Sequence, residues 1–124
     1  MKIAIVGSRN YTDYEKFLTV IKRVFKLSDK VKDNITIISG GATGVDKMAE
    51  RFARENNYKC IIHYPDWQKY GKAAGPKRNT KIVDELNRDT DFVIAFVAKK
   101  SVGTLDTIEK ARNKKIQRYI YYIK

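Results

Sequence analysis

A glycine-rich segment between a short apolar run and an amphipathic stretch constrains this chain more than any other feature. Its sequence is Ser39-Gly40-Gly41-Ala42-Thr43-Gly44-Val45-Asp46. The β-branched run over residues 35–38 predicts a buried strand, and apolar side chains at helical spacing over 45–56 predict a helix. At such a turn, free backbone N–H groups and the positive end of the helix dipole point at one spot, which attracts a phosphate or another anion. A tight connection without a ligand is the alternative interpretation of these glycines.

The remainder of the chain repeats this alternation of strand and helix. Strands are expected over residues 2–6, 35–38, 60–64, 91–97 and 115–123, and helices over 14–27, 45–56, 104–113 and a stretch that Pro76 opens. A polar connection is expected over residues 28–34 and a long loop over 66–76. Alternation of this kind implies parallel strands with helices on both faces, and right-handed crossovers favour a doubly wound topology. We therefore expect an α/β fold: a Rossmann-like, doubly wound, mostly parallel five-stranded sheet flanked by helices on both faces, with residues 1–124 forming a single domain.

The charge of the chain points to anionic partners. Lys and Arg number 26 against 14 Asp and Glu, which gives a net charge of +12. This balance favours polyanionic or phosphorylated partners through long-range attraction, whereas a merely solvated basic surface is the other interpretation. The cations are spread along the chain rather than gathered in a tail.

Several classes of protein are disfavoured by what the sequence lacks. Cys60 is the only cysteine and His63 the only histidine, so neither a disulfide framework nor a metal site is expected. The chain has no Walker A pattern and no dinucleotide fingerprint, and we expect no cofactor. Its first apolar run is too short for a signal peptide, and no stretch is long enough to cross a membrane, so we expect a cytoplasmic protein without a membrane partner.

The residues suited to ligand binding follow the predicted strands. In doubly wound sheets, ligands bind beyond the carboxyl ends of the strands, at the switch in strand order. Because four connections converge there, we expect one pocket. The expected ligand-binding residues are Gly7, Ser8, Arg9, Gly40, Gly41, Ala42, Thr43, Asp46, Trp67, Tyr70, Lys77, Arg78, Asn79, Ser101, Gly103, Thr104 and Asp106.

Each type of group in this set has an expected role. Backbone N–H groups of the 40–41 and 103–104 turns would hold phosphate, and the Arg9 and Arg78 side chains would add charged contacts. Asp46 is either a helix-start cap or an acceptor for a sugar hydroxyl.

The aromatic residues of the 66–76 loop have two interpretations. Trp67 or Tyr70 would stack on a base, or else would fasten the loop to the core. Lys77, in the same stretch, would neutralise phosphate.

Taken together, these motifs resemble the SLOG superfamily, named for the DNA-processing proteins and Lonely-guy enzymes that it includes. Within it, the chain is most similar to the YspA-like branch of small standalone bacterial and phage proteins. The resemblance rests on the segments 6–9 with Asp13, 39–46, 66–67, 70–79, 95–96 and 103–107, of which 70–79 is the most specific. It implies a Rossmann-like fold that binds nucleotides or nucleotide-derived molecules.

One departure from the superfamily bears on catalysis. Lonely-guy phosphoribohydrolases carry a Gly-x-Gly-Thr-x-x-Glu turn with a catalytic glutamate, but here Ser101 replaces the first glycine and Thr107 replaces the glutamate. A hydroxyl group cannot replace that carboxylate as a general acid/base or as the group that stabilises an oxocarbenium-like centre. Asp106 and Glu109 are the neighbouring carboxylates, so the catalytic residues of any such enzyme stay unassigned.

Three functions therefore stand in order of preference. The first is a binding module that senses, carries or sequesters a nucleotide or nucleotide-derived small molecule. The second is an N-glycosidase-type enzyme on nucleoside monophosphates that uses Asp106 or Glu109 with Asp46. The third is binding of single-stranded nucleic acid through the basic surface, a less favoured partner. The aromatic residues over 119–123 mark either a contact in a homo-oligomer or a covered face of the sheet.

Overall fold

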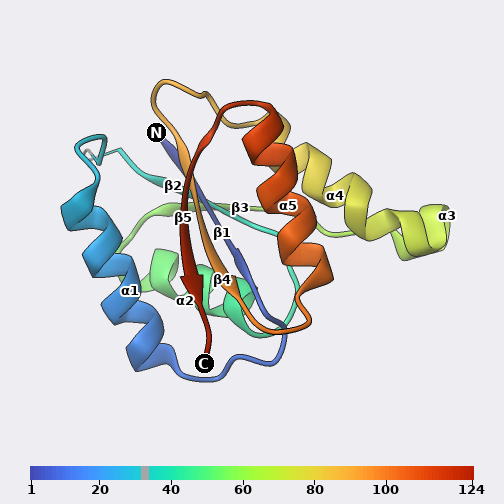
Figure 1. Cartoon of the computed structure of the whole chain (residues 1–124), viewed down its shortest axis with the longest axis horizontal. Helices are drawn as coiled ribbons and strands as arrows, with labels where there is room; N and C mark the ends of the chain where they lie inside the picture. Colours follow the sequence, from blue (N-terminus) through green and yellow to red (C-terminus); the bar gives the residue numbers. More distant parts are fainter. Residues whose placement is uncertain (32–33) are drawn as a thin grey trace.

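Five parallel strands form one sheet in the computed structural model of the protein, which describes residues 1–31 and 34–124 (Figure 1). The strands are β1 (Lys2–Gly7), β2 (Thr36–Ser39), β3 (Lys59–Ile62), β4 (Phe92–Val97) and β5 (Gln117–Tyr122). Their order in the sheet is β3-β2-β1-β4-β5, and every pair of neighbours is parallel. The chain thus winds outward from β1 to β3, then returns to the other side of β1 for β4 and β5. The switch in direction lies between β1 and β4.

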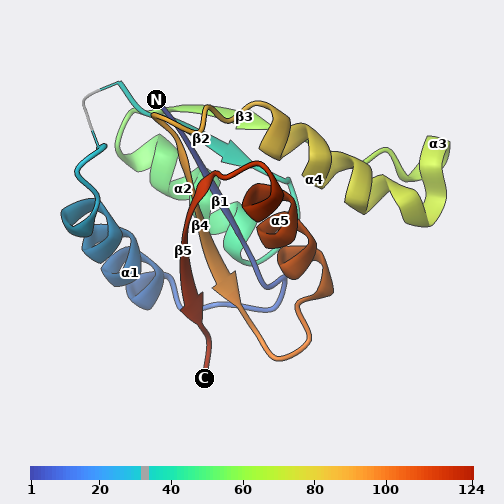
Figure 2. The same ribbon diagram turned by 45° about the horizontal axis from the view of Figure 1, so that its top comes forward.

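Helices cover both faces of this sheet (Figures 1 and 2). They are α1 (Tyr14–Leu27), α2 (Val45–Glu55), α3 (Trp67–Tyr70), the 3₁₀ turn η1 (Gly71–Ala73), α4 (Ala74–Asp84) and α5 (Val102–Asn113). The helices α1 and α2 pack on one face, whereas α4 and α5 pack on the other. The predicted Rossmann-like, doubly wound fold is confirmed, and all five strands are parallel.

The alternation of side chains along β1 supplies both hydrophobic cores. Ile3 and Ile5 belong to the core beneath α1 and α2, and Ala4 and Val6 belong to the core beneath α4 and α5. Successive residues of a strand point to opposite faces, so a strand covered on both sides must be apolar throughout. The whole of β4 is buried for the same reason. These two central strands end side by side, where Gly7 pairs with Phe96.

The prediction of a long loop over residues 66–76 is wrong, because most of that segment is helical. Asp66 caps α3, its Oδ1 accepting the Lys69 N–H at 3.1 Å. After η1, α4 begins at Ala74, so Pro76 is the third residue of the helix rather than its first. Proline is tolerated there because the N–H groups of a first helical turn have no partner within the helix.

Two other features of the chain complete the description. The polar connection predicted over 28–34 falls partly on residues 32–33, which lie outside the described residues, and the rest of it has no helix or strand. Within residues 1–31 and 34–124, none of the helices combines the length and the apolar character needed to span a membrane.

Candidate functional site

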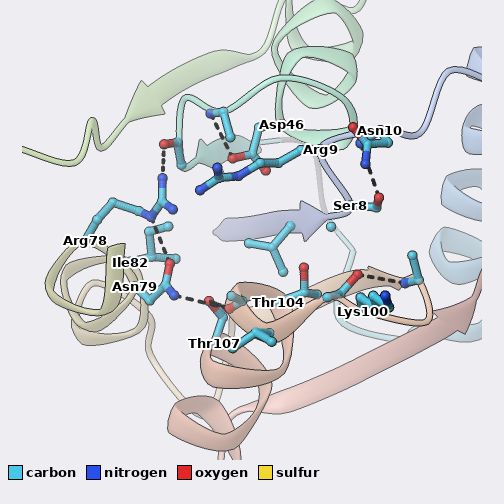
Figure 3. A pocket seen from close by; sticks show the side chains of 18 residues that line it. Ser8, Arg9, Asn10, Asp46, Arg78, Asn79, Ile82, Lys100, Thr104 and Thr107 are labelled. Atoms are coloured by element: carbon cyan, nitrogen blue, oxygen red, sulfur yellow. Dashed lines mark hydrogen bonds between the residues drawn. The ribbon is translucent and has the colours of Figure 1, made fainter. Parts of the chain in front are cut away.

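A pocket of about 410 Å³ opens at the carboxyl ends of β1 and β4, at the switch in strand order (Figure 3). Its walls come from the end of β1, the glycine-rich segment, α4, and the start of α5. The lining residues are Val6, Gly7, Ser8, Arg9, Asn10, Gly40, Ala42, Asp46, Arg78, Asn79, Ile82, Ala98, Lys100, Ser101, Val102, Gly103, Thr104 and Thr107. The position agrees with the rule that ligands of doubly wound sheets bind at this point.

The glycine-rich segment positions the β1–α1 loop. Gly44 has a φ of +73°, and a Cβ on it would lie 2.3 Å from the carbonyl oxygen of Ser8. The Val45 N–H donates to that same oxygen at 3.1 Å, and Thr43 Oγ1 donates to the Arg9 carbonyl at 3.1 Å. The start of α2 therefore holds Ser8 and Arg9 at the edge of the pocket, and this contact requires glycine at position 44.

The backbone N–H groups of the same segment are largely used within the protein. Gly41 donates to Ser39 Oγ at 3.2 Å, and Ala42 donates to Asp46 Oδ2 at 3.1 Å. Gly41 also lies under the ring of Tyr64, outside the pocket. The phosphate cradle expected from the 40–41 turn is thus not formed at Gly41, because Ser39 Oγ already accepts the hydrogen bond of its N–H group.

Asp46 and Arg78 are the buried charged groups of the site. Their residues are 6% and 9% exposed, and Gly40 lies between them, since a Cβ there would be 2.9 Å from Asp46 Oδ2 and 2.8 Å from Arg78 Nη1. Burial raises the pKa of Asp46 to about 6, although the Ala42 hydrogen bond and the Arg78 charge favour its ionised form. Burial also lowers the pKa of Arg78, which Asp46 opposes and Arg9 reinforces.

Two arginines face one carboxylate across this part of the pocket. The Arg78 guanidinium donates through Nη1 to the Gly40 carbonyl and through Nε to Asn79 Oδ1 at 2.8 Å. The Arg9 side chain extends toward Asp46 and Arg78 (Figure 3) and makes no hydrogen bond or ion pair within the described residues. Of the residues that line the pocket, Asp46 is the only acidic one, so the positive charge there exceeds the negative.

The start of α5 forms the opposite wall and offers free donors. Within the described part of the chain, the Gly103 and Thr104 amides and Thr104 Oγ1 have no hydrogen-bond partner, although Thr104 is only 7% exposed. Ser101 Oγ accepts from the Ala98 N–H at 2.9 Å and does not cap the helix. A Cβ on Gly103 would meet nothing within 4 Å, so the space in front of this turn is open.

Asn79 links the two walls rather than offering donors to the pocket. Its Nδ2 donates to the Gly103 carbonyl at 3.2 Å and to Asp106 Oδ2 at 3.0 Å, while its Oδ1 accepts from Arg78. Asn79 therefore fixes the start of α5 relative to the Arg78 side chain.

Of the carboxylates considered for catalysis, Asp46 lines the pocket, whereas Asp106 and Glu109 lie outside it. Asp106 pairs with Lys110 at 2.6 Å, and Glu109 pairs with Arg112 at 3.4 Å. Thr107 of α5 lines the pocket, whereas Asp106 and Glu109 on the same helix do not. An N-glycosidase that relied on Asp106 or Glu109 would need these side chains to move.

Residues Trp67, Tyr70 and Lys77 also lie away from the pocket. The helix α3 stands beyond the far end of α4 (Figures 1 and 2), and the Lys77 Nζ lies 4.7 Å from the centre of the Tyr70 ring. The expectation that Trp67 or Tyr70 stacks on a base inside the pocket does not fit this arrangement. The reason is that the segment continues into α4 as a helix and does not fold over the sheet edge.

The pocket thus contains most, but not all, of the expected residues. Those that line it are Gly7, Ser8, Arg9, Gly40, Ala42, Asp46, Arg78, Asn79, Ser101, Gly103 and Thr104, whereas Gly41, Thr43, Trp67, Tyr70, Lys77 and Asp106 do not. Lining residues missed by the sequence reasoning include Lys100, Ile82 and Thr107. Helical spacing offered a signal for the last two, because Ile82 lies four residues after Arg78 and Thr107 lies four residues after Gly103.

A wholly parallel, doubly wound sheet with a pocket at its switch point defines a Rossmann-like α/β protein. Comparison with known families is more specific. Residues 1–70 match YAcAr, the YspA, cpYpsA-related SLOG family, and the chain belongs to this family. The resemblance noted from the motifs is thereby confirmed.

Two similar proteins extend this finding. The chain is 29% identical over 116 residues to the Gene 61 protein of Mycobacterium phage D29, across 90% of this chain and 88% of that protein. Its fold is similar to the X-ray structure of DNA processing protein A (DprA) from Streptococcus pneumoniae, with a TM-score of 0.65 and 26% identity. That match covers 96% of this chain and 49% of DprA, so the chain spans about half the length of that protein. Family and fold suggest a function related to nucleotides or nucleic acids.

Proposed function

We propose that this protein binds a nucleotide or a nucleotide-derived small molecule in the pocket at the carboxyl edge of the sheet, with residues 1–124 acting as one domain. It would thereby sense, carry or sequester that ligand. The pocket volume of about 410 Å³ suits a ligand of this size. Membership of the SLOG family and likeness to DprA support the proposal at the level of the fold.

The strongest support comes from the unmatched positive groups of the pocket. Arg9 and Arg78 face a single carboxylate, and the α5 N-terminus opposite presents free amides at Gly103 and Thr104. Two cations near one another repel, and an anion between them relieves that repulsion. A phosphate at the α5 N-terminus gains hydrogen bonds from the amides and the favourable end of the helix dipole. In the bound state Lys100 would approach from the rim.

Asp46 gives the proposed ligand a second polar feature. Its Oδ2 accepts from Ala42, while Oδ1 has no partner within the described residues and is not among the fully buried, unpaired atoms. This free oxygen favours the role of hydroxyl acceptor, so a ribose is the expected middle part of the ligand. The base would pack on the exposed aliphatic side chain of Val102, because no aromatic residue lines the pocket and Ile82 is fully buried.

Isothermal titration calorimetry against mono-, di- and cyclic nucleotides and ADP-ribose derivatives tests the proposal. We expect at least one of them to bind, and its affinity to fall about tenfold or more in Arg9→Ala, because a charge-assisted hydrogen bond is lost. Arg112→Ala is the matched control, since it removes the same charge from the exposed side of α5. Absence of binding by the whole panel, or equal losses in the two variants, would contradict the proposal.

Replacing Gly103 with alanine is expected to raise the stability of the protein and to weaken ligand binding. The free energy of unfolding should rise by about 0.5–1 kcal/mol, because alanine favours the helix and no atom lies within 4 Å of the added methyl group. Ligand affinity should fall, because the methyl group enters the space where the phosphate approaches the backbone. Urea unfolding and calorimetry measure the two effects; unchanged affinity would remove the α5 N-terminus from the site.

A further inference from the structure

A basic segment projects from the body of the molecule (Figure 1), and of its residues only Arg78 and Asn79 line the pocket. It consists of α3, η1 and most of α4, residues 67–81, and we call it the arm; its α3 end lies farthest from the sheet (Figures 1 and 2). No acidic residue occurs between Asp66 and Asp84, whereas this stretch contains four lysines and Arg78. Arg78 points into the pocket, so the positive charge on the outside of the arm comes from Lys69, Lys72, Lys77 and Lys81.

These lysines are exposed. None of the four forms an ion pair within the described residues, although most acidic side chains elsewhere on the helices do pair with a neighbouring cation. The lysines also lower the pKa of the Tyr70 hydroxyl, chiefly through Lys69 and further through Lys77 and Lys81. The arm therefore carries a local excess of positive charge that attracts a polyanion.

Aromatic rings accompany these cations on the arm. Trp67 is 50% exposed. Two ammonium groups lie near the Tyr70 ring, with Lys77 Nζ at 4.7 Å and Lys69 Nζ at 5.1 Å from its centre. No residue of α3 is buried, so its tryptophan is not explained by packing in a core.

From this pattern we propose that the arm forms a binding surface for single-stranded nucleic acid, separate from the nucleotide pocket. Lysines contact the phosphate backbone, and the exposed part of Trp67 stacks on a base, which is sequence-tolerant because every base has a π face. An acidic peptide would match the charge but would leave the aromatic faces without a stacking partner. A membrane surface would need a wider apolar face than α3 offers.

The protein carries its own reporter for this interaction, because Trp67 is the only tryptophan. Titration of the full chain with oligothymidylate or oligouridylate of about 16 nucleotides should quench its fluorescence as bases stack. Comparison of the two oligonucleotides distinguishes DNA from RNA. Affinity measured by anisotropy should fall steeply with salt, by roughly 0.7 log unit per log unit of salt for each phosphate contact.

Two sets of variants locate the surface. Trp67→Ala should weaken binding at least about fivefold, and Lys69→Gln/Lys72→Gln/Lys77→Gln should weaken it further and reduce the salt slope by about 2. The triple variant Lys22→Gln/Arg23→Gln/Lys26→Gln on the exposed side of α1 removes the same charge and should retain most of the affinity. Circular dichroism checks that each variant is folded. If Trp67→Ala does not fold, the triple lysine variant still tests the surface, because it retains the fluorescence of Trp67.

The outcomes separate this proposal from the nucleotide pocket. Arm variants should leave small-nucleotide binding unchanged, and Arg9→Ala should leave oligonucleotide binding within about twofold, since Arg9 lines the pocket and is not part of the arm. Lack of binding to both oligonucleotides would overturn the proposal. So would binding without any change in Trp67 fluorescence, equal losses in the arm and α1 triple variants, or equally strong binding of polyglutamate with the same quenching.

Discussion

Asp46→Asn is expected to make the folded protein more stable at pH 7 by about 1–3 kcal/mol, while weakening ligand binding in the pocket. The pKa of Asp46 is raised from 3.8 to about 6 because burial disfavours the charged carboxylate. An amide at this position stays neutral at every pH and can still accept the Ala42 N–H hydrogen bond through its oxygen. It no longer supplies the charged acceptor for a ligand hydroxyl, so stability and binding should change in opposite directions.

The sign of the pH dependence follows from the raised pKa. Below pH 3.8 the carboxyl is protonated in both the folded and the unfolded state, and its favourable contribution to stability is fully present. As pH rises toward about 6, the unfolded chain loses the proton first and this contribution is lost. Urea unfolding at a series of pH values should therefore give the same free energy of unfolding for Asp46→Asn as for wild type, up to a constant offset, at low pH. The difference between the two proteins should then grow as the pH rises to about 6.

A second carboxylate provides the control for this experiment. Asp13 is exposed and caps α1, its Oδ1 accepting the Lys16 N–H at 2.9 Å. Asparagine caps helices about as well as aspartate, so Asp13→Asn should change stability by less than about 0.5 kcal/mol. A variant Asp46→Asn that is less stable than wild type at pH 7 would show that the charge on Asp46 stabilises the fold.

The second large effect is expected at Gly44. Gly44→Ala should reduce the free energy of unfolding by at least about 3 kcal/mol, because two penalties act together. The backbone has a φ of +73°, which an alanine adopts only with strain, and the new Cβ would lie 2.3 Å from the Ser8 carbonyl oxygen. Relief of that clash would displace the β1–α1 loop and with it Arg9, so ligand affinity should fall as well.

Gly71→Ala separates the two penalties. Gly71 also has a positive φ, of +54°, but a Cβ there would meet nothing within 4 Å. This variant should lose only the conformational part, about 1–3 kcal/mol. Urea unfolding of both variants measures the difference, which reports the contact between the start of α2 and the β1–α1 loop. Equal losses would mean that this contact contributes little to stability.

The glycine-rich segment illustrates how far sequence reasoning reaches into the site. Its residue types located it correctly at a strand-to-helix turn next to the pocket. Whether its amides are free could not be read from the sequence, because Ser39 Oγ and the Asp46 carboxylate occupy them through side-chain positions that only packing fixes. The ligand-binding roles of its neighbours stay predictions until the titrations are done.

The sequence by itself determined the order of strands and helices and the parallel, doubly wound sheet. Apolar runs, helical spacing and turn residues are local signals, and the right-handed crossover leaves few topologies for them. Only the tertiary structure decided that α3 points away from the sheet edge and takes Trp67 and Tyr70 with it. It also decided that α5 presents Thr107 to the pocket in place of Asp106. The direction of a helix and the face that it turns inward depend on contacts between residues distant in the chain, here those that Asn79 makes with Gly103 and Asp106, and no local pattern encodes such contacts.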